Sequence, residues 1–338
     1  MAVIVITGGT AGIGRATALR FAKEGYDVAV IARGEEGLRE TVAELQATGV
    51  RAAGFSADVA DAVQIARTAD SIESELGPVS VWINSAMCTI MSPFEDIDPN
   101  EYKRVTDVTY LGAVNGTREA LRLMTPRNKG TIVQIGSALA YRSIPLQSAY
   151  CGAKAAIRGF TDALRCELIY QRSAIRLTMV HLPGTNTPQF GWARNKLGHP
   201  ARPVAPVYQP EAIAKAIAKA IAKAIFNATC HAPRETWVGK ATVQSILGNY
   251  VFPQWLDNML AKKAWSGQME NAERLAPHPD NLFIPVEGQH QSRGRFSKEA
   301  KESVISINSA TPVRVAFTAV GLGALILFKK YQIRRKRN

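Results

Sequence analysis

Short apolar runs rich in β-branched residues alternate, over the first 240 positions, with longer segments whose apolar residues recur at helical spacing. The runs predict strands at residues 2–7, 27–32, 51–56, 79–84, 131–137, 175–182 and 235–239. The longer segments predict helices at residues 11–24, 36–46, 62–76, 101–124, 148–170 and 211–226. Strands that alternate with helices predict an α/β fold, in which helices cover both faces of a doubly wound parallel sheet of about seven strands.

The last predicted helix carries a repeated Ala-Ile-Ala-Lys unit. The repeat separates an apolar stripe from a basic stripe, as in an amphipathic helix. We expect the apolar stripe to cover the sheet, and contact with a membrane is the alternative. The two stripes are Ile213, Ile217, Ile221 and Ile225 on one side and Lys215, Lys219 and Lys223 on the other.

The regular pattern weakens from residue 249 onward, which predicts a compact domain over residues 1–250. A chain of 338 residues with 46% hydrophobic residues can bury one large α/β core, and about a hundred residues remain. Residues 251–311 form a predicted extension, within which the proline- and glycine-containing stretch 277–297 is typical of a polar linker or an extended arm.

A glycine-rich turn joins the first predicted strand to the first predicted helix. Its sequence runs from Thr7 through Gly8-Gly-Thr-Ala-Gly12-Ile-Gly14. Glycines at such a turn let the backbone approach a pyrophosphate, whose charge is received by the free N–H groups at the helix N-terminus. The turn therefore predicts a dinucleotide site, and its predicted contacts are Thr7, Gly8, Thr10, Gly12, Ile13 and Gly14.

Polar residues and turns follow several later strands, at the edge where open parallel sheets bind ligands. Each of these features has a structural explanation on its own, but their sequence order supports one site. Asp58 is expected to hold an adenine edge, and the segment after Pro183 offers hydroxyls and backbone donors to a carboxamide. The expected contacts are Asp58 and Val59, Asn84 and Ala86, and Pro183, Gly184, Thr185 and Thr187.

Tyr150 and Lys154 stand four residues apart on a predicted helix, so they share a face. A nearby ammonium favours phenolate and is expected to lower the pKa of Tyr150 from its ordinary value of about 10. A tyrosine of this kind can donate a proton to a carbonyl or accept one from an alcohol. Ser137 ends a predicted buried strand, where its hydroxyl would orient the substrate oxygen.

Together these features resemble the short-chain dehydrogenase/reductase family over residues 1–240. The resemblance implies a Rossmann-like fold and a nicotinamide cofactor. It also implies that Tyr150 is the general acid and base, that Lys154 binds the nicotinamide ribose and lowers the pKa of the tyrosine, and that Ser137 positions the carbonyl. The matching segments are Thr7-Gly8-x-x-x-Gly12-x-Gly14, Asp58, Asn84-Ser-Ala86, Ser137, Tyr150-x-x-x-Lys154 and Pro183-Gly184.

One position departs from the family pattern. The family usually has Asn in the stretch Val-Asn-Leu-x-Gly, where it helps to hold a water of the proton relay, whereas this chain has Thr109. A hydroxyl can still bond a water or its own helix backbone. We therefore expect an altered relay rather than a lost one.

The end of the second predicted strand bears on the choice of nicotinamide. An NAD enzyme is expected to place a carboxylate there, and an NADP enzyme a cation. This chain has Ala32 followed by Arg33, which favours NADP(H); a solvated loop arginine is the alternative.

The C-terminus combines an uncharged apolar run at residues 315–328 with a basic cluster at residues 329–337. Fourteen residues are short for a membrane span. The six cations of the cluster would strengthen attachment to an anionic leaflet, so residues 312–338 are expected to associate with a membrane. A nucleic-acid-binding or solubilising tail is the alternative, and no nucleic-acid partner is expected.

Four cysteines without pairing or metal spacing, and no signal peptide before the first strand, favour a reducing cytoplasmic compartment without a metal site. The leading hypothesis is an NADP(H)-dependent oxidoreductase acting on a carbonyl or secondary alcohol. If the protein is anchored to a membrane, a lipophilic substrate is expected. A cofactor-binding scaffold or redox sensor, and an epimerase or dehydratase, are the alternatives. The resemblance suggests a homo-oligomer, and the residues expected above Tyr150 are Met87, Leu139, Tyr141 and Phe190.

Overall fold

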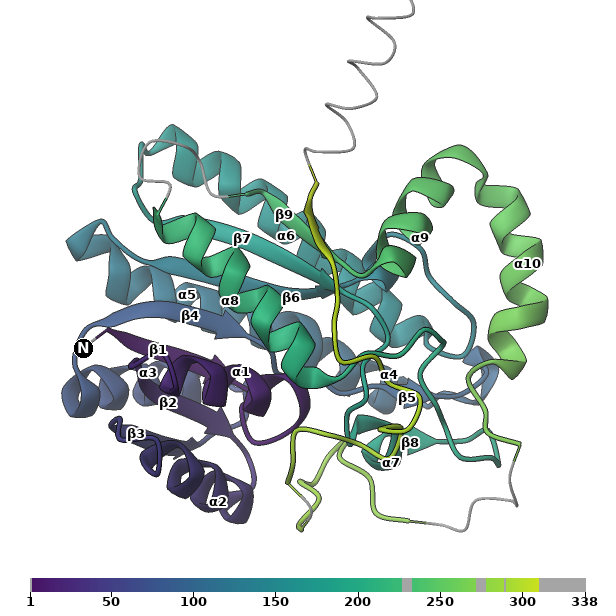
Figure 1. Ribbon diagram of the computed structural model, residues 1–338, viewed down its shortest axis with the longest axis horizontal. Coiled ribbons are helices and arrows are strands. Elements are labelled where there is room, and N and C mark those ends of the chain that lie inside the picture. The colour runs from purple at the N-terminus through teal and green to yellow at the C-terminus, as the bar shows by residue number, and fades with distance from the viewer. Residues whose placement is uncertain (1, 227–232, 272–277, 289, 310–338) are drawn as a thin grey trace, which may run out of the picture.

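The computed structural model describes residues 2–226, 233–271, 278–288 and 290–309. Its centre is a sheet of eight strands in the order β10-β9-β7-β6-β4-β1-β2-β3 (Figure 1). Seven strands run parallel and β10 pairs antiparallel with β9. The strands are β1 Val3–Thr7, β2 Asp27–Ala32, β3 Ala52–Ser56, β4 Val79–Asn84, β6 Thr131–Ser137, β7 Arg176–Leu182, β9 Glu235–Val238 and β10 Ser306–Asn308.

Helices cover both faces of this sheet, as the hydrophobic pattern predicts (Figure 1). One face packs against α1 Gly12–Ala22, α2 Glu35–Gln46 and α8 Pro210–Phe226. The other packs against α3 Ala62–Leu76, α4 Pro99–Thr106, α5 Gly112–Met124 and α6 Ser148–Tyr170. The predicted α/β fold is confirmed, and all seven predicted strands are present.

The amphipathic prediction for α8 is confirmed for the residues whose side chains are described. Ile213, Ile217 and Ile221 are buried in the core cluster that includes residues of β1 and β6, whereas Lys215 and Lys219 are exposed. Ile225 and Lys223 lie outside the described side chains. Burial of apolar surface against the sheet therefore explains the repeat.

Helical residues run without interruption from Pro99 to Met124, which confirms the predicted helix over residues 101–124, but its hydrogen bonding is not α-helical throughout. A π-helical turn, Asp107–Leu111, separates α4 from α5. Thr109 lies in this turn and is fully buried. The sequence pattern does not reveal the π-turn, because such a turn adds a residue to the helix without removing the apolar periodicity on either side.

Smaller elements surround the carboxyl edge of the sheet. β5 Ile90–Met91 pairs with β8 Arg194–Asn195, and α7 Gln189–Trp192 lies between β7 and β8 in the chain. Short 3₁₀ turns occur at Phe94–Asp96, Thr125–Arg127 and Ala138–Ala140. Of these segments, α7 and the turn Ala138–Ala140 contribute residues to the cavity above the strand ends.

Residues after 239 continue as α9 Lys240–Val251 and α10 Pro253–Ser266, and among the described residues an irregular segment, 290–305, leads into β10, with residues 278–288 also irregular. Segment 278–288 packs on the α/β core, where Leu282 is fully buried. The domain boundary at residue 250 stays a prediction. The last residues of the chain, 310–338, which include the predicted membrane-associating segment, lie outside the described residues.

Candidate active site

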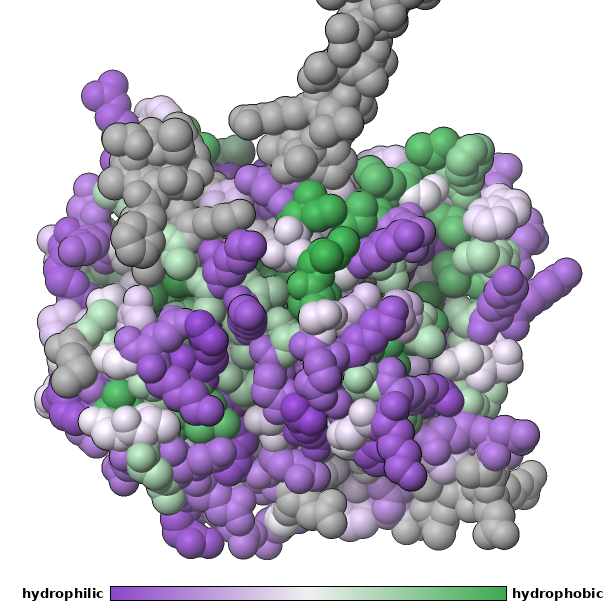
Figure 2. All heavy atoms as spheres, viewed as in Figure 1, coloured by the Kyte–Doolittle hydropathy of each residue, from purple (hydrophilic) through white to green (hydrophobic). Residues whose placement is uncertain are grey.

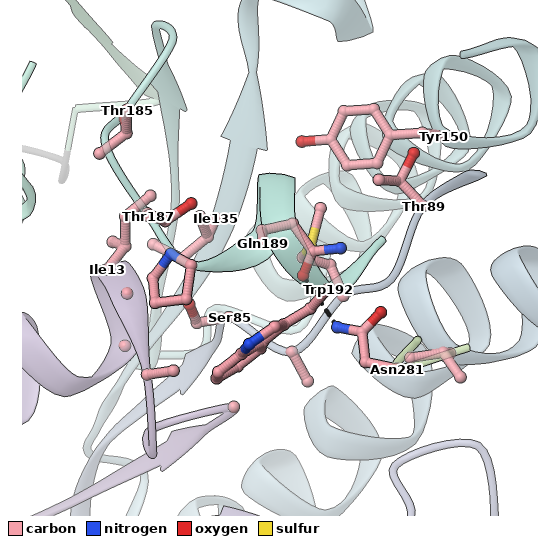
Figure 3. Close-up of a pocket in the computed structure, with 18 of the residues that line it drawn as sticks. Ile13, Ser85, Thr89, Ile135, Tyr150, Thr185, Thr187, Gln189, Trp192 and Asn281 are labelled. Atoms are coloured by element: carbon pink, nitrogen blue, oxygen red, sulfur yellow. Dashed lines mark hydrogen bonds between the residues drawn. The ribbon is translucent and has the colours of Figure 1, made fainter. Parts of the chain in front are cut away.

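A cavity of about 340 Å³ opens above the carboxyl ends of the parallel strands. It extends from the turn after β1 and the end of β2 to the start of α6 (Figure 3). Sixteen of the residues expected at the cofactor or catalytic site line it, namely Gly8, Thr10, Gly12, Ile13, Gly14, Arg33, Asp58, Val59, Ala86, Ser137, Tyr150, Lys154, Pro183, Gly184, Thr185 and Thr187. The fold therefore brings together segments that are separated by up to 179 positions.

Two expected contact residues, Thr7 and Asn84, do not line the cavity. The hydroxyl of Thr7 accepts hydrogen bonds from the N–H groups of Ser85 and Ala86, at 3.0 and 3.1 Å. It thereby ties the end of β1 to the loop after β4. Thr7 thus shapes the cavity wall from behind.

The amide of Asn84 is buried below the cavity in a side-chain network. Its oxygen accepts from the indole N–H of Trp82 at 3.0 Å, and its nitrogen donates to Thr117 and Gln134 at 3.0 and 3.1 Å. These bonds join β4 to β6 and α5. Every hydrogen bond of this amide is therefore directed away from the cavity.

The glycine turn has the geometry that an anion site requires. Gly12 has a φ of +55°, and a Cβ on Gly14 would collide with the carbonyl oxygen of Gly8. Helix α1 begins at Gly12 without a side-chain cap and without an acidic residue in its first turn. Its N-terminal N–H groups and helix dipole therefore suit a phosphate group.

Arg33 follows directly after β2, and its guanidinium is close enough to that of Arg104 for the two charges to interact. Arg104 donates to the carboxylate of Asp58 at 2.5 Å, so the expected adenine contact is already paired with a cation. Burial, and secondarily the charge of Arg104, lower the pKa of Arg33. The ordinary pKa of arginine is above 12, so the guanidinium of Arg33 keeps its positive charge near neutral pH.

Ser137, Tyr150 and Lys154 meet at the other end of the cavity. Ser137 ends β6, and its oxygen accepts from the N–H of Leu139 at 3.1 Å. Tyr150 and Lys154 occupy the first two turns of α6. In Figure 3 the hydroxyl of Tyr150 points into the space that Ile135 and Thr185 border from the opposite side.

Lys154 is 2% exposed, and its Nζ donates to the carbonyl of Ile135 at 2.7 Å. This ammonium lies 5.6 Å from the centre of the Tyr150 ring. Burial lowers the pKa of Lys154 to about 8. Two of the three ammonium donors stay available to other acceptors.

The expected lowering of the Tyr150 pKa by the neighbouring lysine is wrong for the chain alone. Burial raises the pKa of Tyr150, and the hydrogen bond from Ser137 opposes this rise only in part. The phenol is therefore the stable form in the protein at neutral pH. In this form Tyr150 is suited to donate a proton.

Thr109, which stands in place of the family's Asn, bonds the loop after β4. Its hydroxyl donates to the carbonyl of Cys88 at 3.0 Å and accepts from the N–H of the same residue at 3.2 Å. Both hydrogen-bonding functions of the hydroxyl are thus used on the backbone. The expected effect on a proton relay stays a prediction.

Of the four residues expected above Tyr150, Met87, Leu139 and Phe190 line the cavity, and Tyr141 does not. The hydroxyl of Tyr141 instead donates to the carboxylate of Glu235 at 2.5 Å. Its ring faces away from the substrate side because it packs against Trp237 and under the guanidinium of Arg158. Position along the chain could not reveal this direction.

The sequence pattern did not predict a buried polar cluster that lies behind Ser137. His181 is fully buried, with Nδ1 3.0 Å from the carbonyl oxygen of Ser137 and Nε2 3.5 Å from Glu235. Burial acts to raise the pKa of Glu235, but bonding and charge from His181, with hydrogen bonds from Tyr141 and Trp237, hold that pKa at about 2. The signal in the sequence was a lone carboxylate in the apolar strand β9.

Within the described part of the chain, no cluster of three or more His, Cys, Asp or Glu side chains is placed to hold a metal. Cys88 and Cys151 are buried and Cys166 is exposed, all three as free thiols, while Cys230 lies outside the described residues. No helix among the described residues has the length and apolar character needed to cross a bilayer.

Comparison with known families agrees with this geometry. The sequence model of the family described as short chain dehydrogenase matches residues 2–197, more than half of the chain. The chain therefore belongs to the short-chain dehydrogenase family. Membership supports a nicotinamide-dependent oxidoreductase as the general class.

Two curated relatives and two solved structures illustrate the likeness. The chain is 30% identical over 317 residues to the uncharacterized oxidoreductase YxnA of Bacillus subtilis, covering 90% of this chain and 86% of the relative. It is 28% identical over 234 residues to the 3-ketodihydrosphingosine reductase of Bos taurus, covering 67% and 70%.

A putative short-chain alcohol dehydrogenase from Sinorhizobium meliloti shares 31% identity, with a TM-score of 0.52 over 55% of this chain and 72% of that one. An alcohol dehydrogenase from Thermococcus sibiricus, solved in complex with 5-hydroxy-NADP, shares 23% identity. Its TM-score is 0.60 over 70% of this chain and 95% of that one, which supports the fold.

Proposed function

We propose that this protein is an NADP(H)-dependent oxidoreductase that interconverts a carbonyl and a secondary alcohol. The observation that carries the proposal is a continuous cavity, lined at one end by the glycine turn and at the other by Ser137, Tyr150 and Lys154. A dinucleotide with its phosphates at the N-terminus of α1 can place its nicotinamide near Tyr150.

The cofactor, when bound, supplies or accepts a hydride at the nicotinamide ring. In the reductive direction Tyr150 donates its phenolic proton to the substrate oxygen, because its pKa keeps the proton on the phenol at neutral pH. Ser137 hydrogen-bonds the same oxygen and fixes its orientation. Lys154 offers its remaining donors to the nicotinamide ribose and stabilises the tyrosinate left after transfer.

Replacing Tyr150 by Phe tests the assignment. The variant should lose at least about 100-fold in kcat on any accepted carbonyl or alcohol, since it lacks the proton donor, and should still bind NADPH. Tyr170→Phe is the matched control, because Tyr170 lies on the same helix and is 90% exposed. Steady-state kinetics on a broad carbonyl and alcohol panel, with NADPH titration by fluorescence, give both readouts.

The same panel separates the alternative functions. NADPH binding without turnover of any panel member would favour a cofactor-binding scaffold or redox sensor. Product formation without net consumption of NADPH would identify an epimerase or dehydratase that regenerates its cofactor within each cycle. Unimpaired kcat in Tyr150→Phe would contradict proton transfer through this residue.

Arg33 supports NADP(H) as the preferred cofactor. It is a cation at the end of β2, and the guanidinium of Arg104 lies nearby. Strand β2 ends without a carboxylate, and the nearby carboxylate of Asp58 is already paired with Arg104. A 2′-phosphate would therefore find complementary charge.

The ratio of Kd values for NADPH and NADH measures this preference. We expect NADPH to bind more tightly, and Arg33→Ala to weaken NADPH by about 10- to 100-fold, the value of one or two charge-assisted hydrogen bonds. NADH should be affected much less. An equal loss for both cofactors would make Arg33 a structural residue, and tighter binding of NADH by the wild type would overturn the preference.

The substrate is proposed to be lipophilic. Apolar side chains, including Met87, Leu139, Ile144 and Val204, line the same cavity as Tyr150. One relative is named a 3-ketodihydrosphingosine reductase, which supports a substrate with a long apolar part.

Membrane association through residues 312–338 is proposed together with this substrate class. The apolar run and its six following cations are the sequence basis. In addition, exposed apolar side chains gather where α9 meets α10, as Figure 2 shows. The four most exposed of these are Tyr250, Val251, Phe252 and Trp255, each more than 60% exposed.

A further inference from the structure

The C-terminal extension returns to the glycine turn, although more than 260 residues separate the two in the chain. We call residues 278–288 and 290–297 the arm. The N–H of Gly12 donates to the carbonyl of Gln291 at 3.0 Å, and Arg15 of α1 donates to the carbonyl of His290. Figure 1 shows this segment, in yellow-green, passing along the lower part of the molecule beside α7.

A second part of the arm is bonded to the two arginines at the end of the cavity. Arg33 donates to the carbonyls of Phe283 and Asn281, at 2.8 and 2.6 Å. Arg104 donates to the carbonyl of Leu282 at 3.0 Å. Three consecutive carbonyls thus accept hydrogen bonds from the two guanidinium groups. The fully buried side chain of Leu282 anchors this segment in the core.

The ring of His290 packs the arm against α2 and α7. It packs so closely on Gly37 that a Cβ there would collide with the ring, and it lies 5.3 Å from the indole of Trp192. Asn281 donates to the side-chain oxygen of Gln189 at 3.0 Å, the dashed line in Figure 3. The arm is therefore held at two points, at His290 by α2 and α7 and at Asn281 by α7.

The arm and the glycine turn line the same cavity. Asn281, Pro285, Val286 and His290 face it from the arm, while Gly12 and Arg33 face it from the sheet. The carbonyls use two of the five guanidinium donors of Arg33, so three are left for a ligand. Gly12 is the first residue of α1, and the N–H groups after it are not taken by the arm.

We propose that the arm is the outer wall of the cofactor site, covering the adenosine half of the dinucleotide and holding Arg33 in place for its phosphate. This proposal rests on the proposed nicotinamide-binding function. A cofactor in the cavity that the arm and the glycine turn line together enters and leaves when the contacts of His290 and Leu282 open. The arm therefore sets the rate of cofactor exchange as well as part of the affinity.

The test compares NADPH dissociation rates of full-length variants by stopped-flow fluorescence. His290→Ala removes the packing on Gly37 and Trp192, and Leu282→Ala removes the buried anchor. Each should raise the dissociation rate at least 10-fold. Ile284→Ala is the matched control, because Ile284 lies on the arm and is 74% exposed, and it should leave the rate unchanged.

Hydrogen exchange on the wild-type protein provides a measurement that needs no variant. NADPH should slow exchange both at residues 8–15 and at residues 281–292. Protection of the glycine turn with an unchanged arm, or unchanged dissociation rates in folded arm variants, overturns the arm proposal and leaves the cofactor assignment intact. Faster exchange of the arm with NADPH, or tighter binding by His290→Ala, shows a competing plug and also overturns it. A wild type that binds neither nicotinamide overturns the proposed function itself.

Discussion

Single residues at the active site show how burial changes the chemistry that spacing suggests. The spacing of Tyr150 and Lys154 predicts a cation that lowers the phenol pKa. In the folded chain, burial raises the pKa of the tyrosine and lowers that of the lysine. Desolvation disfavours the charged form of each group and is the largest cause of both shifts, while the ammonium of Lys154 donates to the carbonyl of Ile135.

The lowered pKa of Lys154 predicts a pH dependence of stability. With a pKa of about 8 in the folded state and about 10.5 when unfolded, the unfolded chain binds more protons between these values. The contribution of Lys154 to the free energy of unfolding should therefore rise as pH increases through this window. Relative to Lys154→Met, wild type should gain about 1 to 2 kcal/mol between pH 8 and 9.5.

Urea unfolding of both proteins across this pH range checks the prediction. Methionine is an unbranched side chain, one atom shorter than lysine and without its charge, so effects of other titrating groups cancel in the difference. If the difference in the free energy of unfolding between the two proteins is constant with pH, Lys154 titrates alike in the folded and unfolded states.

At the scale of elements, the π-helical turn between α4 and α5 is joined to the loop after β4 through the buried hydroxyl of Thr109. Thr109 bonds both backbone groups of Cys88, next to Met87 and Thr89 in the cavity wall. The turn therefore fixes the course of this wall. Helical periodicity predicted one helix over residues 101–124 but not this contact, because a long-range hydrogen bond has no signature in local spacing.

Thr109→Val should destabilise the protein by about 1 to 3 kcal/mol, since an isosteric methyl leaves the buried N–H and C=O of Cys88 without partners. Thr109→Ser keeps the hydroxyl and should cost less. Chemical denaturation of the two variants measures the difference. Equal stability of the valine and serine variants would show that these two hydrogen bonds contribute nothing net.

At the scale of the whole molecule, the chain after residue 239 contributes to three separate surfaces. It adds β10 to the edge of the sheet, α9 and α10 beside the substrate end, and the arm beside the glycine turn. The relative YxnA is similar over 90% of this chain, so the likeness reaches beyond the core domain.

Deletion of residues 312–338 should move the protein from the membrane fraction to the soluble fraction, because it removes the apolar run and six cations while leaving β10 and the arm in place. Fractionation of cells that express each form measures the change. A variant with the six cations replaced by Gln but the apolar run intact separates electrostatic from apolar binding. Full-length protein found only in the soluble fraction would contradict the proposal.

The sequence by itself determined the seven parallel strands, the glycine turn and the Ser137, Tyr150 and Lys154 group. Apolar periodicity and short fixed spacings record these features locally, and the carboxyl edge of a parallel sheet collects them. Only the tertiary structure decided that Asn84 and Tyr141 face away from the cavity, that His181 and Glu235 support Ser137, and that the arm lies against Gly12 and Arg33. Each of these contacts depends on the direction of a side chain or on residues 44 to 279 positions apart, and packing fixes such contacts without leaving any local pattern in the chain.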